Sequence, residues 1–107
     1  MSGSGNGKAR HFKLVVSEHQ AHLLQEQYET AVTAGLGQAF RDNLHTIASR
    51  LQTDADTFGE EQYNLHHLKL QIRLGILLPV VVEYGLHKEQ SMLFLRRVLF
   101  LPPQHKG

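Results

Sequence analysis

The sequence predicts one α+β domain, in which a strand and a helical hairpin precede a three-stranded antiparallel meander. In the first half of the chain, apolar residues recur at every third or fourth position, which is typical of amphipathic helices. After residue 66 they alternate with polar residues or form short apolar runs, which is typical of strands. The connections are short enough for consecutive strands to pair. We expect a flexible tail rich in glycine and serine over residues 1–10, and a single domain over residues 11–107.

The first strand and the first helix follow from local signals. Residues 12–17 are rich in β-branched and aromatic side chains, which favours a short strand. Ser17 and Gln20 then fit a capping box, in which the hydroxyl and the amide bond backbone N–H groups of the first helical turn. We therefore expect a helix to begin after Ser17 and to end near Gly35. Its apolar stripe consists of Ala21, Leu24, Tyr28 and Ala31.

A second helix and a loop are predicted before the sheet. Gly35 and Gly37 turn the chain, and the helical spacing then returns. The residues that carry it are Leu36, Phe40, Leu44, Ile47 and Leu51. Because the connection is so short, the two helices should pack as a hairpin. Residues 53–64 are polar and contain Gly59, and we interpret them as a loop.

Three strands are predicted in the C-terminal part of the chain. The clearest alternation runs over residues 67–74. We expect its apolar members to face the helices, namely Leu68, Leu70, Ile72 and Leu74, and its polar members to stay accessible, namely His67, Lys69, Gln71 and Arg73. Pro79 opens a strand over residues 80–84. A polar turn over residues 87–91 then leads to an apolar strand over residues 92–101.

The composition argues against several kinds of site. The chain has no cysteine, which excludes a disulfide, a thiolate metal site and a cysteine nucleophile. Its eight histidines form no His-Glu-x-x-His motif, so we predict neither a metal site nor a cofactor. The longest apolar run, residues 74–82, contains Pro79 and is too short to cross a bilayer. We expect no contact with a membrane and a cytoplasmic location.

Cationic side chains are the most informative polar feature. The net charge of +1 is spread unevenly, because residues 18–61 are acidic and both ends of the chain are basic. Lys69 and Arg73 share one side of the alternating strand, and Arg96 and Arg97 interrupt an apolar one. Because neighbouring strand residues point to opposite faces, one of these two arginines should join Lys69 and Arg73. Such a face is either an ordinary solvated surface or a phosphate-binding one.

The element order resembles the RelE/ParE toxin superfamily, whose members include plasmid-stabilisation toxins of type II toxin–antitoxin systems. The resemblance covers about residues 11–101 and rests on the alternating basic strand, on Pro-Val-Val-Val-Glu-Tyr at 79–84 and on Met-Leu-Phe-Leu-Arg-Arg-Val-Leu at 92–99. It implies a RelE/ParE-like fold with an open, cationic sheet face. In the RNA-cleaving members, that face cuts messenger RNA on the ribosome without a metal ion.

The resemblance also implies roles for particular residues. Lys69, Arg73 and one of Arg96 or Arg97 match the cationic set, and Tyr84 or His105 would transfer the proton. Two features of the chain depart from the pattern. The positions before the middle-strand tyrosine, where relatives commonly have an arginine, hold Val81 and Val82, and the chain continues into Pro102 and Pro103 rather than a catalytic tail.

These departures favour a toxin component that acts by binding rather than by efficient RNA cleavage. The resemblance implies an acidic antitoxin protein as its partner, with the ribosome and its messenger RNA or DNA gyrase as its target. Two alternatives remain open. The first is a ribosome-dependent, metal-independent endoribonuclease of messenger RNA. The second is a non-toxic interaction module that forms a homodimer through an exposed strand edge.

Overall fold

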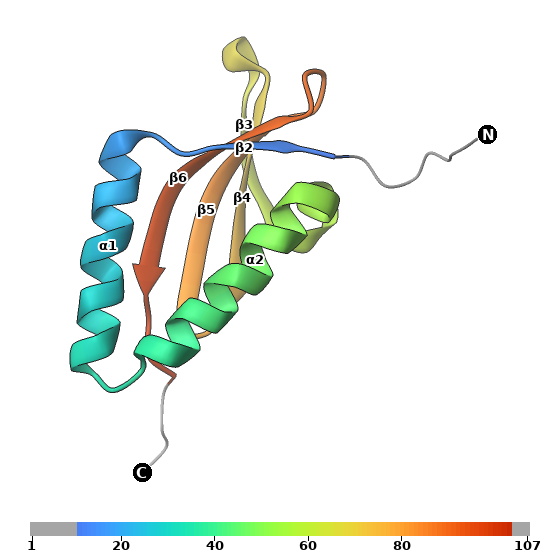
Figure 1. Cartoon of the computed structure of the whole chain (residues 1–107). Coiled ribbons are helices and arrows are strands. Elements are labelled where there is room, and N and C mark those ends of the chain that lie inside the picture. The colour runs from blue at the N-terminus through green and yellow to red at the C-terminus, as the bar shows by residue number, and fades with distance from the viewer. Residues whose placement is uncertain (1–10, 104–107) are drawn as a thin grey trace.

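The computed structural model of the protein describes residues 11–103, so the tail predicted over residues 1–10 lies outside the described part. The α+β class is confirmed (Figure 1). The elements in chain order are β2 (Lys13–Val15), α1 (Glu18–Thr33), α2 (Gly37–Phe58), β3 (Glu60–Leu65), the short 3-10 helix η1 (His66–Leu68), β4 (Leu70–Leu77), β5 (Val80–His87) and β6 (Met92–Phe100).

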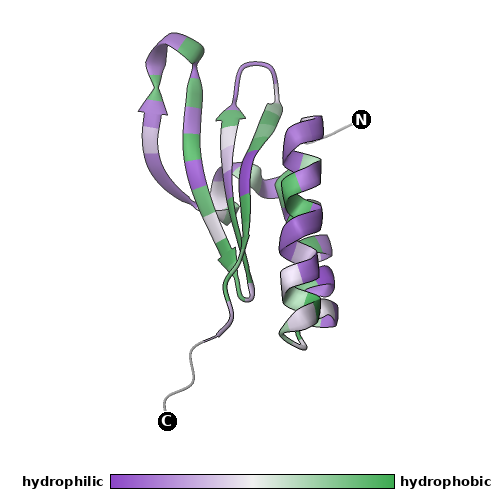
Figure 2. Ribbon diagram, turned by 90° about the vertical axis from the view of Figure 1, so that its left-hand side faces the viewer, coloured by the Kyte–Doolittle hydropathy of each residue, from purple (hydrophilic) through white to green (hydrophobic). Residues whose placement is uncertain are grey.

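The strands form one mixed sheet in the order β2-β6-β5-β4-β3. Strand β2 pairs with β6 in parallel, and the other neighbours are antiparallel. Seen from the side, the two helices lie over one face of the sheet, and no described element covers the other (Figure 2). We call these the helix face and the open face.

The sheet has one strand more than the sequence predicted. Residues 53–64, interpreted as a loop, hold the end of α2 and all of β3 except its last residue, Leu65. Strand β3 lies at the edge of the sheet, and all its residues except Leu65 are exposed. Both faces of this edge strand are exposed to solvent, so its apolar and polar residues do not alternate. Alternation is the signal that identifies a strand in a sequence.

The boundaries of α1 follow the predicted signals, whereas α2 extends beyond the predicted start of the loop at residue 53. The hydroxyl of Ser17 accepts a hydrogen bond from the backbone N–H of Gln20 at 3.1 Å, which confirms the predicted cap of α1. The chain leaves α1 through Gly35, whose φ of +79° is unfavourable for residues with a side chain. Helix α2 continues to Phe58 across a kink at Asp54, which has non-helical angles of −134° and 44°.

The core lies between the helices and the helix face. Strands β5 and β6 contribute alternate residues to it, which are Val80, Val82, Tyr84, Leu86, Leu93 and Val98. The helices contribute Ala31, Phe40, Ile47, Leu51 and Ala55, and Phe12 adds a ring from just before β2. Side chains alternate along a regular strand, so a residue that pairs with a core residue points to the helix face and its neighbours in the chain point to the open face.

The two faces of strand β4 are exchanged relative to the prediction. Leu70, Ile72 and Leu74 do share one face, but Ile72 pairs with Gly85 and Arg73 pairs with the core residue Tyr84. The leucines and the isoleucine therefore lie on the open face, whereas Arg73 points toward the helices and is only 8% exposed. The predicted burial of the apolar set against the helices is wrong, and so is the predicted exposure of Arg73. Leu68 lies in η1 and is exposed.

Candidate functional site

The structure places two of the four predicted cations together and the other two apart. Arg96 and Arg97 are exposed on the open face, near the middle of β6. Lys69 is exposed in the turn before β4. Arg73 lies in the row of Tyr84 and Leu95, beside the bulge, but it is buried beneath the helices. The single cationic surface expected from the sequence is therefore not present in this form.

A β-bulge brings Arg96 and Arg97 to the same face. Glu83 pairs with Arg97 and Tyr84 pairs with Leu95, so Arg96 is the extra residue in β6. Leu95 and Val98 on either side still pack against the core. The Nε of Arg96 lies 3.9 Å from a carboxylate oxygen of Glu83, whose side chain points to the open face. The prediction that only one of the two arginines shares this face is wrong, because the bulge interrupts the alternation.

The rest of the open face is largely apolar. A row across four strands consists of Tyr63, Ile72, Gly85 and Phe94. A Cβ added at Gly85 would lie 3.3 Å from the Cδ1 of Ile72, so this glycine lets neighbouring side chains close over the centre of the face. As a result Ile72 is fully buried, although no helix covers it.

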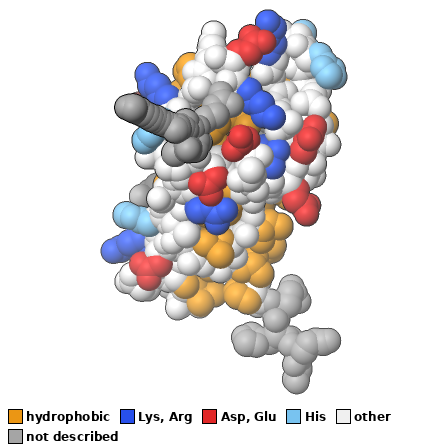
Figure 3. Space-filling view, turned by 90° about the vertical axis from the view of Figure 1, so that its right-hand side faces the viewer, with side chains coloured by type: hydrophobic (Ala, Val, Ile, Leu, Met, Phe, Trp, Pro, Cys, Tyr) orange, Lys and Arg blue, Asp and Glu red, His pale blue; other side chains and the backbone are white. Residues whose placement is uncertain are grey.

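Exposed apolar side chains continue the open face toward the β4–β5 turn. Ile76 of β4 pairs with Val81, and Val81 pairs with Leu99 of β6. Ile76 is 56% exposed, and Leu99 is exposed as well. Just beyond this row, Leu101 donates its backbone N–H to Pro79. A view of the right-hand side of the molecule shows hydrophobic side chains gathered in its lower part (Figure 3).

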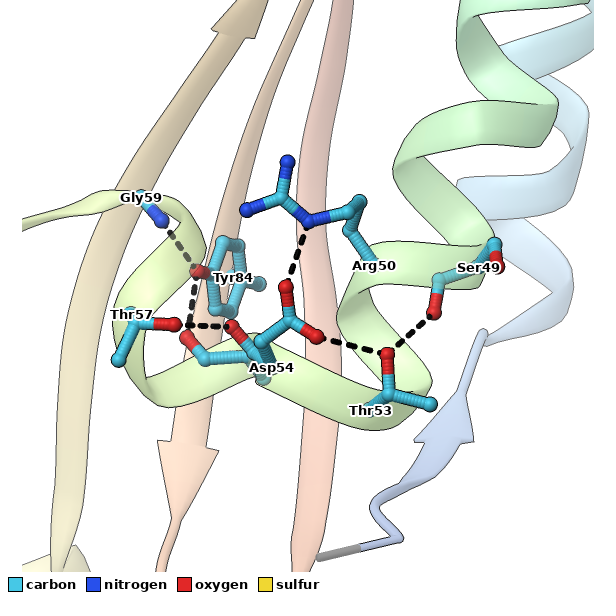
Figure 4. A network of polar contacts seen from close by, with 8 residues as sticks. Ser49, Arg50, Thr53, Asp54, Thr57, Gly59 and Tyr84 are labelled. Atoms are coloured by element: carbon cyan, nitrogen blue, oxygen red, sulfur yellow. Dashed lines mark hydrogen bonds and ion pairs between the residues drawn. The ribbon is translucent and has the colours of Figure 1, made fainter. Parts of the chain in front are cut away.

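Tyr84, the residue proposed for proton transfer, has no exposed surface. Its hydroxyl donates to the carbonyl of Ala55 at 2.8 Å and accepts from the N–H of Gly59 at 3.1 Å (Figure 4). Burial raises the pKa of Tyr84 and outweighs the opposing effects of Arg73 and the Gly59 N–H. The hydroxyl therefore fastens the end of α2 to the sheet and does not reach the open face.

Side chains around the kink of α2 reinforce this attachment (Figure 4). The carboxylate of Asp54 accepts hydrogen bonds from Thr53 at 2.7 Å and from Arg50 at 2.6 Å. These two groups, Thr53 first, lower the pKa of the Asp54 carboxyl. The guanidinium of Arg50 also lies 4.9 Å from the ring centre of Phe58, in the last turn of the helix.

Arg73 of β4 also attaches the end of α2 to the sheet. Its guanidinium donates to the carbonyl of Gly59 and, at 2.6 Å, to the side-chain oxygen of Gln71. Its Nε is buried without a hydrogen-bond partner, and no carboxylate among residues 11–103 lies within ion-pair distance of it. Among the residues that the structure describes, the buried positive charge of Arg73 thus has no direct counter-ion.

Lys69 occupies a strained turn. Its backbone is left-handed, with φ 57° and ψ 37°, and its ammonium group lies 3.4 Å from the carboxylate of Glu89 in the β5–β6 turn. His105, the other residue proposed for proton transfer, lies outside the described residues. Within the described range, no cluster of three or more histidine, aspartate or glutamate side chains could hold a metal ion.

Two further observations concern the environment and relatives of the protein. No helix in the part of the chain that the structure describes is long and apolar enough to cross a membrane. Comparisons with protein-family models, with curated proteins and with solved structures found no match to this chain.

Proposed function

We propose that the protein is a RelE/ParE-like toxin component that acts by binding a target through its open face, without efficient RNA cleavage. The observation that carries this proposal is the bulge in β6. It presents Arg96 and Arg97 together on a sheet face that no described element covers. The order of elements, with both helices on one side, supports the same proposal.

The geometry favours binding over cleavage. Attack of a ribose hydroxyl on the adjacent phosphate needs an accessible group that moves the proton. Tyr84 cannot serve, because its hydroxyl is buried and already bonded to Ala55 and Gly59. Of the cations that would stabilise the developing charge, Arg73 points into the core and Lys69 lies in the turn before β4, so that only Arg96 and Arg97 remain on the open face.

The open face also suits the partner implied by the resemblance, an acidic antitoxin protein. An amphipathic segment could place carboxylates on Arg96 and Arg97 and apolar side chains on Ile76 and Leu99. Pairing of two copies through the edge strand is less favourable. Strand β3 carries adjacent glutamates and a register shift after Glu61, and both features hinder the addition of another strand.

Induced expression in a bacterial host tests the proposal. We expect growth to slow without ribosome-dependent cuts in messenger RNA, and the double variant Arg96→Ser, Arg97→Ser to relieve the effect. The matched control is Arg41→Ser, which removes an exposed arginine from the helical side and should leave the growth effect in place.

Two results would contradict this function. Messenger RNA cuts that disappear in the double variant would establish the endoribonuclease instead. Normal growth with the folded wild-type protein present at high level would exclude the toxin function and favour the non-toxic interaction module. The homodimer expected of such a module would be detected by its mass in solution.

A further inference from the structure

We propose that a cavity between the tips of the β3–β4 and β5–β6 connections binds a small phosphate monoester of about the size of a nucleoside monophosphate. The two tips project side by side beyond the helices (Figure 1). The cavity between them has a volume of about 290 Å³, near the lower end for sites of small organic ligands. It is lined by Asn64, Leu65, His66, Lys69, Leu70, Gln71, Leu86, Lys88 and Glu89.

The charges on the rim favour an anion that carries more than one negative charge. Lys69 comes from one tip and Lys88 from the other, while Glu89 provides a carboxylate. Lys69 and Glu89 are paired at 3.4 Å, but both side chains are about two-thirds exposed, at 64% and 68%. Such an exposed pair contributes little free energy. A phosphate dianion can therefore take the place of the Glu89 carboxylate beside Lys69.

A third positive charge lies behind the wall of the cavity. Gln71 lines the cavity, and its side-chain oxygen accepts a hydrogen bond from Arg73 at 2.6 Å. Arg73 is buried, its Nε has no hydrogen-bond partner, and it forms no ion pair within residues 11–103. Because few charges screen a buried guanidinium, its field extends through Gln71 and favours an anion in the cavity. On the same wall, the side-chain amide of Asn64 donates a hydrogen bond to the carboxylate of Glu61 at 2.9 Å.

The backbone of the two tips is consistent with a ligand site. Among the non-glycine residues that the structure describes, Lys69 and Ser91 alone have positive φ, at 57° and 52°. They belong to the two turns that bracket the cavity, and non-glycine residues in this conformation concentrate at ligand sites. Leu65 and Leu70 in the lining are partly exposed and offer apolar contacts for the organic part of the monoester.

This site is independent of the proposed function, because it uses neither Arg96 nor Arg97. Calorimetric titration of the full chain with adenosine monophosphate, inorganic phosphate and adenosine tests it. We expect the monophosphate to bind more tightly than phosphate, and adenosine not to bind. Lys69→Asn should weaken binding of the monophosphate about tenfold, as loss of a charge-assisted hydrogen bond does, and asparagine tolerates the left-handed backbone. Thermal unfolding checks that this variant folds.

A variant of opposite sign and a matched control sharpen the test. Glu89→Gln removes the competing carboxylate and should tighten binding of the monophosphate about threefold or more. Arg96→Ser removes an arginine from the open face and should leave the affinity unchanged. The proposal is refuted by adenosine binding as tightly as its monophosphate, by unchanged affinity in Lys69→Asn, or by no heat of binding at millimolar ligand. Equal affinity for phosphate and the monophosphate would refute the claim that the cavity recognises the organic part of the monoester.

Discussion

Replacement of Tyr84 by phenylalanine tests whether this residue supports the fold rather than catalysis. Its hydroxyl stands between the carbonyl of Ala55 and the N–H of Gly59. These are the two groups that the next hydrogen bond of α2 would join if the helix continued. The variant keeps the ring in the core but leaves a buried carbonyl and a buried N–H without the hydroxyl that satisfies them.

The expected loss follows from those two groups. Each buried backbone group left without a partner costs about 1–2 kcal/mol, so Tyr84→Phe should lower the free energy of unfolding by about 2–4 kcal/mol. With a urea dependence of about 1.5 kcal/mol/M, the unfolding midpoint would fall by about 2 M. Tyr28→Phe is the matched control, because the Tyr28 hydroxyl bonds Arg41 at the surface. It should cost about 0.5 kcal/mol or less.

The pH dependence gives an independent check. Because burial raises the pKa of Tyr84, the folded state keeps the proton that the unfolded chain releases above about pH 10. The stability contributed by this group is complete below about pH 10 and is lost as the pH rises through the folded pKa. The difference in stability between wild type and Tyr84→Phe should therefore shrink from pH 8 to about pH 11. Equal urea midpoints for Tyr84→Phe and Tyr28→Phe at pH 8 would refute this interpretation of the hydroxyl.

Two further changes test the sheet by urea unfolding. Ile72→Ala should cost about 2–4 kcal/mol because Ile72 is fully buried, whereas Leu68→Ala in the exposed turn should be nearly neutral; similar losses would show that the open face does not bury Ile72. Deletion of Arg96 should be tolerated, because the shortened strand places Leu95 and Val98 on the core side in regular alternation. Deletion of Val81 from β5, where no bulge exists, should unfold the protein, and a folded product would contradict the register argument.

Most of the helical half of the fold could be predicted because its signals are local. The Ser17 cap and the apolar stripes depend on residues within a few positions of one another, and both helices pack through these stripes, although Ala21 is exposed. Strand β3 could not be predicted in the same way. It is held by pairing with β4 rather than by burial of its own side chains, so its sequence reads as a polar loop.

The prediction of which face of β4 points toward the helices was wrong for a different physical reason. An alternating strand has two faces, and the rule that apolar residues face the core decides between them only when the other face is wet. Here water is excluded from both faces of β4. On the open face, neighbouring side chains cover Ile72. On the helix face, Arg73 can be buried because it donates hydrogen bonds to the carbonyl of Gly59 and to the side chain of Gln71. A buried arginine with such partners looks, in the sequence alone, like an exposed one.

The candidate sites depend on two features that break regular periodicity. The bulge in β6 brings Arg96 and Arg97 to one face, and the left-handed turn at Lys69 separates that residue from the regular part of β4. Neither feature has a sequence signal as strong as alternation, because each is stabilised by the strand or turn that faces it. The four cations that seem to form one surface are therefore divided: Arg96 and Arg97 lie on the open face, Lys69 lies in the turn before β4, and Arg73 is buried. Because Lys69 and Arg96 form ion pairs with different carboxylates, Glu89 and Glu83, removal of Lys69 should leave the contacts of Arg96 and Arg97 intact.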